Sequence, residues 1–120
     1  MKKQNYFTGR WKAVGYVFTG MGKVLRSEHS IWAQWGFFML NLMIAYYLDY
    51  VLWEWMVTIL GWGMIFTAET LNTAIEKLAD VVSPEYHPGI GDVKDISAGA
   101  VGWAAFTVLI IFITLLFKHI

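Results

Sequence analysis

A stretch of twenty residues without a charged side chain, Ala98–Phe117, constrains the fold of this chain more than any other feature. As an α-helix it would be about 30 Å long, which is enough to cross the hydrocarbon core of a bilayer. Ile31–Leu48 is a second uncharged stretch, of eighteen residues, interrupted only by Gln34 and Asn41. Because 58% of the residues are hydrophobic and only 15% are charged, the composition favours a membrane protein over a soluble domain.

A third apolar segment, Trp55–Ala68, is only about 21 Å long as a helix, and it continues without a glycine or proline into Glu69–Glu76. We therefore predict one long helix whose second half leaves the hydrocarbon or lines a polar interior. The alternative for Trp55–Ala68 is a buried helix of a soluble protein, but this needs a core to bury it, and the remaining chain offers only two more apolar helices. The sequence predicts an all-α membrane protein, a single domain over 1–120, with membrane-associated helices at 31–48, 55–80 and 96–117.

The first 28 residues have the pattern of an amphipathic surface helix. Their large apolar side chains recur at alternating steps of four and three, which places them on one helical stripe. The members of this stripe are Phe7, Trp11, Val14, Phe18, Met21 and Leu25. Six basic residues lie in the same segment, with no acid before Glu28. A basic amphipathic helix over 1–28 is expected to lie on an anionic membrane surface.

The basic residues also predict the orientation of the chain. Eight of the nine Lys and Arg residues precede the first span or lie at the end of the second span and in the loop after it, and only Lys118 follows the last span. Positive loops face the cytoplasm, so we expect a cytoplasmic N-terminus, a cytoplasmic 77–95 region and a C-terminus outside. The net charge of zero argues against nucleic acid as a partner.

Polar residues gather on one face of the second predicted span. Glu69, Asn72, Thr73, Glu76 and Asp80 lie at helical offsets of 0, 3, 4, 7 and 11, which share one face. A solvated helix end explains Asp80 well and Glu76 in part. It explains Glu69 poorly, because Glu69 directly follows an apolar run and a carboxylate at a membrane boundary is costly. This face is therefore the candidate functional site.

The neighbouring segments suggest a ligand for this face. Glu28 lies at the same predicted membrane boundary as Glu76, and two carboxylates suit Mg²⁺ bound together with substrate phosphates. The loop over 83–95 contains Lys94, whose charge suits phosphate, and the flat side chains of Tyr86 and His87, which suit a base. The alternative is a merely polar turn between helices. A Walker-type loop is excluded, because the glycine-rich segment at 15–23 lacks a preceding strand and the required Lys-Ser/Thr pair.

The run Glu69-Thr70-Leu71-Asn72-Thr73-Ala74-Ile75-Glu76, followed by Asp80, Glu85-Tyr86-His87 and Lys94-Asp95, resembles the prokaryotic diacylglycerol kinases, which include the undecaprenol kinases. The resemblance covers essentially the whole chain. It implies a homotrimeric helical bundle with active sites shared between subunits, in the bacterial cytoplasmic membrane. It also implies transfer of phosphate from MgATP to the primary hydroxyl of a membrane lipid, diacylglycerol or undecaprenol.

The resemblance also implies roles for individual residues. Glu69 matches the proposed general base, and Asn72 matches its polar partner in the catalytic site. Glu28 and Glu76 match carboxylates that contact the metal and the nucleotide. The other matching nucleotide contacts are Tyr16, Glu85, Tyr86, His87, Lys94 and Asp95. On the substrate side the candidates are Arg10, Glu69 and Ala98, with Lys12 an alternative to Arg10.

Two other classes of function stay open at this point. A small oligomeric channel or transporter could use Glu69 and Asn72 in an ion pathway, and a structural scaffold would leave the acidic face unexplained. A transport path needs polar groups through the depth of the bilayer, whereas the third span has only Thr107 and Thr114. The sequence therefore favours the kinase, with the identity of the lipid acceptor undetermined.

Overall fold

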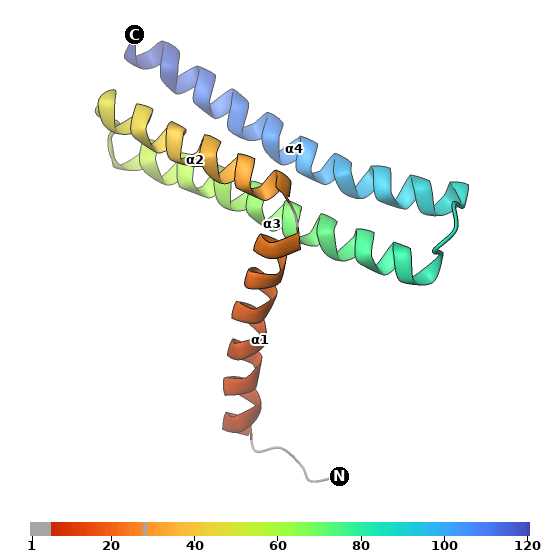
Figure 1. Ribbon diagram of the computed structural model, residues 1–120. Coiled ribbons are helices and arrows are strands. Elements are labelled where there is room, and N and C mark those ends of the chain that lie inside the picture. Colours follow the sequence, from red (N-terminus) through yellow and green to blue (C-terminus); the bar gives the residue numbers. More distant parts are fainter. Residues whose placement is uncertain (1–5, 28) are drawn as a thin grey trace.

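A computed structural model describes residues 6–27 and 29–120 of the chain, which form four α-helices. These are α1 (Tyr6–Ser27), α2 (His29–Tyr47), α3 (Leu52–Val82) and α4 (Pro88–His119). Figure 1 shows α4 running alongside α3 over its length, α2 alongside the first half of α3, and α1 pointing away from the other three helices. The prediction of an all-α fold is confirmed, and residues 1–5 and 28 of the expected surface helix lie outside the described residues.

The connections between the helices follow local backbone chemistry. Asp49 closes the end of α2 with a positive φ of 55°, a left-handed conformation that aspartate tolerates better than most residues. The Tyr50 amide then donates to the Ala45 carbonyl at 3.1 Å, which satisfies an otherwise free helix-end acceptor. A tight turn therefore brings α3 back alongside α2.

The fourth helix begins earlier than the expected residue 96. Pro88 occupies its first turn, where a missing backbone N–H costs nothing, and His87 caps it because the ring Nδ1 accepts from the Gly89 amide at 3.0 Å. The expected loop over 83–95 is therefore reduced to residues 83–87. Lys94 and Asp95 lie on the helix rather than on a loop.

The helices pack around two apolar clusters that both involve α3 and α4. Trp62, Ile65, Ala104 and Val108 form one cluster, with Phe38 of α2 against it. The second cluster lies at the other end of α2 and contains Ala45, Tyr50 and Leu115. The hairpin of α3 and α4 is therefore the framework that positions the candidate site.

Gly61 allows α3 and α4 to approach closely. A Cβ at this position would lie 3.0 Å from Val108 Cγ2 and 3.6 Å from Ile111 Cδ1. We expect Gly61→Val to separate the helices and cost about 1–3 kcal/mol. Thermal unfolding in detergent measures this loss. Gly63→Val is the matched control, because it adds the same β-branched side chain where nothing lies within 4 Å. Equal stability of the two variants would contradict the close packing.

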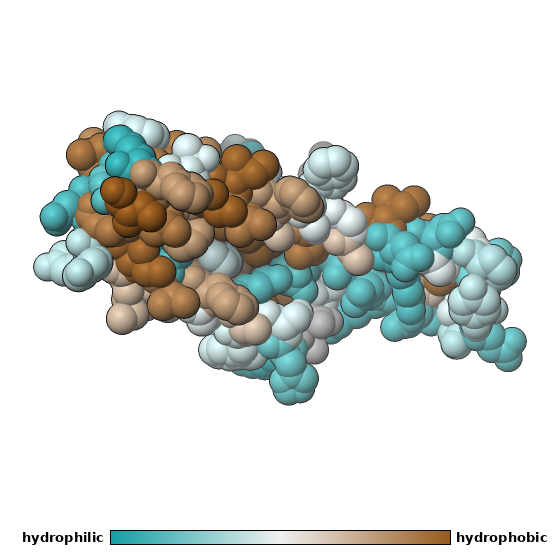
Figure 2. Space-filling model, turned by 90° about the horizontal axis from the view of Figure 1, so that it is seen from above, coloured by the Kyte–Doolittle hydropathy of each residue, from teal (hydrophilic) through white to brown (hydrophobic). Residues whose placement is uncertain are grey.

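Among the described residues, α4 is the one helix that is long and apolar enough to cross a membrane by length and hydropathy. Many large apolar side chains on the other helices are nevertheless exposed, including Phe37 and Met43 on α2 and Leu60 on α3. Figure 2 shows hydrophobic side chains over much of the molecule and hydrophilic ones toward its right-hand end, where α3 passes into α4. Residues 6–27 and 29–120 thus form a helical structure with one candidate membrane span among them.

An ion cluster joins the opposite end of the α3–α4 hairpin. Glu54 is completely buried, and its carboxylate accepts from the Val51 amide at 2.9 Å and from Lys118 Nζ at 3.1 Å. His119 Nε2 lies 2.9 Å from Glu54 Oε2, and the His119 ring stacks on Tyr50. The cluster therefore connects the start of α3 to the last residues of α4.

Candidate active site

The polar face of α3 is buried where the helix passes α2. Glu69, Asn72 and Thr73 are each no more than 9% exposed, whereas Asp80 lies near the helix end and is exposed. Glu76, between them, is half-buried. Because α3 is continuous from Leu52 to Val82, these side chains keep the helical spacing that places them on one face. The burial of Glu69 distinguishes it from a solvated helix-end carboxylate.

Two side chains of α2 donate hydrogen bonds to the Glu69 carboxylate. The Ser30 hydroxyl donates to Oε1 at 2.9 Å, and the Gln34 amide donates to Oε2 at 3.1 Å. Ser30 and Gln34 are one helical turn apart, so both face α3. In the sequence, Ser30 and Gln34 form a polar pair at positions i and i+4, which could have indicated a shared polar face. Taken alone, Gln34 is only a polar residue that interrupts an apolar run. The structure therefore adds both residues to the candidate site.

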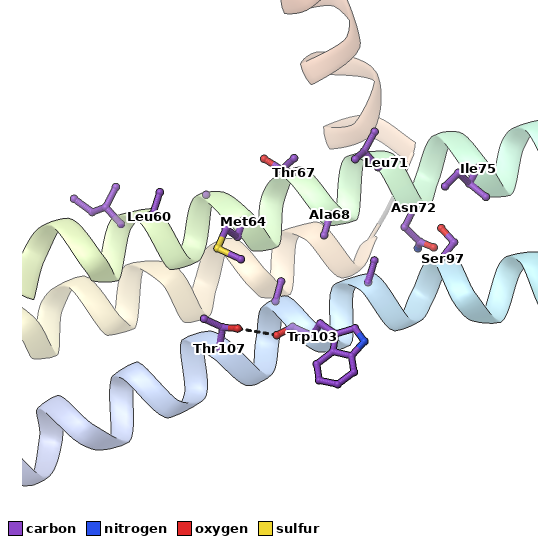
Figure 3. Close-up of a pocket in the computed structure, with 14 residues that line it drawn as sticks. Leu60, Met64, Thr67, Ala68, Leu71, Asn72, Ile75, Ser97, Trp103 and Thr107 are labelled. Atoms are coloured by element: carbon purple, nitrogen blue, oxygen red, sulfur yellow. Dashed lines mark hydrogen bonds between the residues drawn. The ribbon is translucent and has the colours of Figure 1, made fainter.

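Asn72 lies one turn after Glu69 and directs its amide toward Glu76. The distance from Asn72 Nδ2 to Glu76 Oε1 is 3.5 Å, at the long limit of a hydrogen bond. Asn72 Oδ1 is buried and has no partner among the described residues, and the same is true of Ser97 Oγ on α4. Figure 3 shows these two side chains pointing toward one another from α3 and α4. Unpaired buried polar atoms facing one another are suited to a polar ligand group.

Asn72 and Ser97 lie at one end of a long groove between α3 and α4. The groove has a volume of about 840 Å³, and its other lining residues are mainly apolar, such as Leu60, Met64 and Trp103. Thr107 also lines it, but its hydroxyl donates to the Trp103 carbonyl of its own helix at 3.0 Å. The groove therefore combines apolar walls with a polar end next to Asn72.

Lys94 pairs with Asp80 across the hairpin, with Nζ 2.6 Å from Oδ1. The two side chains are 39% and 64% exposed. An exposed pair of this kind contributes only about 0–1 kcal/mol, so a phosphate group could compete with Asp80 for the lysine. Asp95, the next residue on α4, is exposed. The position of Lys94 is compatible with the phosphate contact that the sequence predicts.

The other predicted nucleotide contacts are dispersed. Tyr86 is 87% exposed, and Glu85 is exposed while its carbonyl accepts from Ser83. His87 uses Nδ1 to cap α4. These residues lie at the tip of the α3–α4 hairpin (Figure 1), beyond Glu76 along α3. The structure places them at the same end of the molecule without bringing them into contact with Glu69.

The predicted residues of α1 are not brought to the acidic face. Tyr16 and Arg10 are exposed, and the Arg10 guanidinium lies 5.0 Å from the centre of the Tyr6 ring. Both lie on the helix that points away from the other three (Figure 1). Ala98 of α4 is also exposed, and Glu28 lies outside the described residues.

The described residues contain no group of three histidine, aspartate or glutamate side chains placed to hold a metal ion. The predicted pair for Mg²⁺ consists of Glu76 and Glu28, and the second of these is not described. A cation bound by one carboxylate, water and phosphate oxygens would need fewer protein ligands than three. The half-buried Glu76 carboxylate is the described residue suited to such a contact.

Comparison with known proteins identifies the family. The prokaryotic diacylglycerol kinase family matches residues 15–116. The diacylglycerol kinase of Escherichia coli strain K12 is 30% identical over 113 residues, which cover 94% of this chain and 93% of that protein. The undecaprenol kinase of Bacillus subtilis strain 168 is 38% identical over 60 residues, which cover 50% of this chain and about half, 49%, of that relative. The chain belongs to the prokaryotic diacylglycerol kinase family, a family of lipid kinases.

Proposed function

We propose that this protein transfers the γ-phosphate of ATP to the primary hydroxyl of diacylglycerol, giving phosphatidic acid. The observation that carries the proposal is the buried Glu69 carboxylate. It accepts hydrogen bonds from two side chains of α2, and it lies on the same face of α3 as Asn72 and Glu76. Membership of a lipid kinase family supports the reaction class. The long match to a diacylglycerol kinase supports this acceptor, and the shorter match to an undecaprenol kinase makes undecaprenol the alternative.

In the proposed reaction Glu69 is the general base. A lipid alcohol is a poor nucleophile, and a carboxylate within hydrogen-bond distance of the hydroxyl can accept its proton as the bond to phosphorus forms. Asn72, one turn away, is proposed to orient the reacting groups through its unpaired carbonyl oxygen. Little covalent chemistry is required of the protein, because phosphoryl transfer depends mostly on positioning and charge neutralisation.

The remaining site residues are proposed to bind MgATP. Glu76 and Glu28 would hold Mg²⁺, which neutralises phosphate charge when bound, and Lys94 would contact phosphate after leaving Asp80. The other proposed nucleotide contacts are Tyr16, Glu85, Tyr86, His87 and Asp95. Arg10 and Ala98 are proposed substrate contacts. Since Arg10 and Tyr16 lie on α1, away from Glu69 of the same chain, this assignment requires either a change in the α1 angle or an α1 from another subunit.

The proposed setting is the bacterial cytoplasmic membrane. We infer that α2, the part of α3 from Trp55 to Ala68, and α4 up to Phe117 span the bilayer, with α1 on the cytoplasmic surface and the C-terminus outside. The apolar side chains exposed on α2 and α3 support this arrangement, since they need a lipid or protein environment. We also propose a homotrimer, in which neighbouring subunits would cover part of these surfaces and complete the nucleotide site.

The rival function, an oligomeric channel, requires polar groups along the whole depth of the bilayer. In the part of the chain that the structure describes, Thr107 on α4 satisfies its hydroxyl within its own helix. On α3 the buried polar residues Glu54 and Thr58 at its start are separated from those at Glu69 and beyond by the segment 59–66, which has no polar side chain apart from the Trp62 indole. This distribution favours the kinase.

In the decisive experiment, the purified protein is incubated with labelled ATP, Mg²⁺ and one lipid at a time. We expect label to appear in phosphatidic acid when diacylglycerol is supplied. Label in undecaprenyl phosphate, with none in phosphatidic acid, would instead assign the alternative acceptor. Transfer to neither lipid would refute the proposed kinase function.

A further inference from the structure

We propose that the two oxygens of the Glu69 carboxylate have separate tasks, with Gln34 holding Oε2 in place while Oε1 accepts the proton of the lipid hydroxyl. Ser30 occupies Oε1 in the absence of the acceptor and is displaced by it. This inference rests on the proposed function and adds Gln34 to it as a positioning residue.

The two hydrogen bonds to Glu69 differ in the donor and in its surroundings. Gln34 is half-buried and donates to Oε2 at 3.1 Å, whereas Ser30 is exposed and donates to Oε1 at 2.9 Å. The terminal torsion of a glutamate side chain is broad, so an unanchored carboxylate could rotate and exchange its oxygens. The amide donor of half-buried Gln34 on Oε2 opposes this rotation and leaves Oε1 on the side of the exposed Ser30.

The orientation of Gln34 supports a role in holding Glu69. Its amide nitrogen faces the carboxylate, because its carbonyl oxygen in that place would be repelled. As a result Gln34 Oε1 is buried without a hydrogen-bond partner among the described residues. An unpaired buried acceptor is unfavourable in a mainly apolar helix. The orientation of Gln34 therefore provides a hydrogen bond to Glu69 at the cost of leaving the carbonyl oxygen of Gln34 without one.

Ser30 presents to Oε1 the same chemical group as the lipid acceptor, an alcohol O–H. Its exposed side chain has one rotatable carbon–carbon bond, so the hydroxyl can turn away without disturbing α2. In the reaction the acceptor hydroxyl would donate its proton to Oε1 and form a bond from its oxygen to the γ-phosphorus. The bond between that phosphorus and the bridging oxygen breaks, ADP leaves with the bonding electrons, and Glu69 later releases the proton to water.

If the two carboxylate oxygens of Glu69 have separate tasks, substitutions of Gln34 and Ser30 should have different kinetic effects. Gln34→Met keeps the length of the side chain and removes the donor, so the base becomes misaligned. We expect kcat to fall about 10–100-fold while KM for ATP is unchanged. Ser30→Ala removes the group that competes with the acceptor, so KM for the lipid should fall. Asn41→Leu is the matched control, since Asn41 is a buried polar residue of the same helix and has no role in the site.

Steady-state kinetics in mixed micelles, with thermal unfolding of each variant, tests the inference. The expected result is a kcat loss in Gln34→Met with little change in melting temperature, and a lowered lipid KM in Ser30→Ala. Unchanged kcat in Gln34→Met, while Glu69→Gln is inactive, would overturn the inference and leave the proposed function standing. Equal kcat losses in both variants with matching losses of stability would overturn it as well. Full activity of Glu69→Gln would instead refute Glu69 as the general base, together with the inference, whereas transfer of phosphate to neither lipid by the unmodified protein would refute the proposed function.

Discussion

Replacing Glu69 with glutamine is expected to abolish phosphate transfer to the lipid. The amide keeps the shape of the side chain but cannot accept the proton of the acceptor hydroxyl, and a positioned general base contributes about 10²–10⁴-fold to rate. Nucleotide binding should persist, because Glu69 bonds to α2 and is not among the proposed nucleotide contacts. The rate of lipid phosphorylation and the affinity for ATP, measured separately on the same preparation, distinguish the two effects.

Asp92→Asn is the control for this experiment. It makes the same change from acid to amide at an exposed position of α4 that has no proposed role in the site. We expect activity close to that of the unmodified protein. Near-normal turnover by Glu69→Gln would contradict the assignment of the base. Loss of ATP binding in the same variant would show that Glu69 acts on the nucleotide instead.

Replacing Glu54 with glutamine is expected to cause the largest loss of stability among the variants described here. Glu54 is completely buried, and the substitution leaves Lys118 and His119 without the anion that they contact. Breaking a buried ion pair from one side is harmful because the remaining partner loses its compensation, and this applies to His119, which is 18% exposed, more than to Lys118, which is 50% exposed. A glutamine can still accept from the Val51 amide through its carbonyl oxygen, so the expected loss comes from the missing anion beside Lys118 and His119. Thermal unfolding in detergent measures the effect.

The acidity of Glu54 makes this prediction dependent on pH. Burial by itself would raise the pKa of Glu54, but hydrogen bonds from the Val51 amide, His119 and Lys118 outweigh it and lower the pKa from 4.5 to about 2. A lowered pKa in the folded state contributes stability above the pKa of the unfolded state, and this contribution is lost as the pH falls. The difference in stability between the unmodified protein and Glu54→Gln should therefore shrink as the pH falls from 4.5 to 2.

Asp49→Asn is the matched control at the same end of the molecule. It converts an acid to an amide at an exposed position, where the positive φ of 55° suits asparagine. Its melting temperature should stay close to that of the unmodified protein. If Glu54→Gln and Asp49→Asn have the same stability at pH 7, the ion cluster does not hold α3 to α4.

Much of the fold follows from the sequence because the apolar segments are long. A charge-free stretch such as Ala98–Phe117 has one dominant outcome, a helix, and the uninterrupted passage from Ala68 to Glu69 predicts that α3 continues. The start of α4 was less predictable, because Pro88 and the nearby glycines suggest a turn as readily as a first helical turn. The cap from His87 decides between them, and it depends on the local geometry of the side chain.

The candidate site was predictable on α3 but not across helices. Helical spacing alone places Glu69 and Asn72 on one face, whereas the contact of Glu69 with Gln34 depends on how α2 packs against α3, over a separation of 35 residues. The cluster of Glu54 with His119 depends on packing across 65 residues in the same way. For this reason the sequence presents Gln34 only as an isolated polar residue in an apolar run, and it contains no signal for the cluster around Glu54.

The proposed reaction is direct transfer of phosphate from ATP to a lipid hydroxyl at the acidic face of α3. Phosphorus-31 NMR of the purified protein in mixed micelles with diacylglycerol, Mg²⁺ and ATP follows the transfer without labels. We expect the γ-phosphate signal to decline while signals of ADP and a new lipid phosphomonoester grow in equal amounts. An unchanged spectrum, or conversion of the γ-phosphate to inorganic phosphate alone, would contradict it.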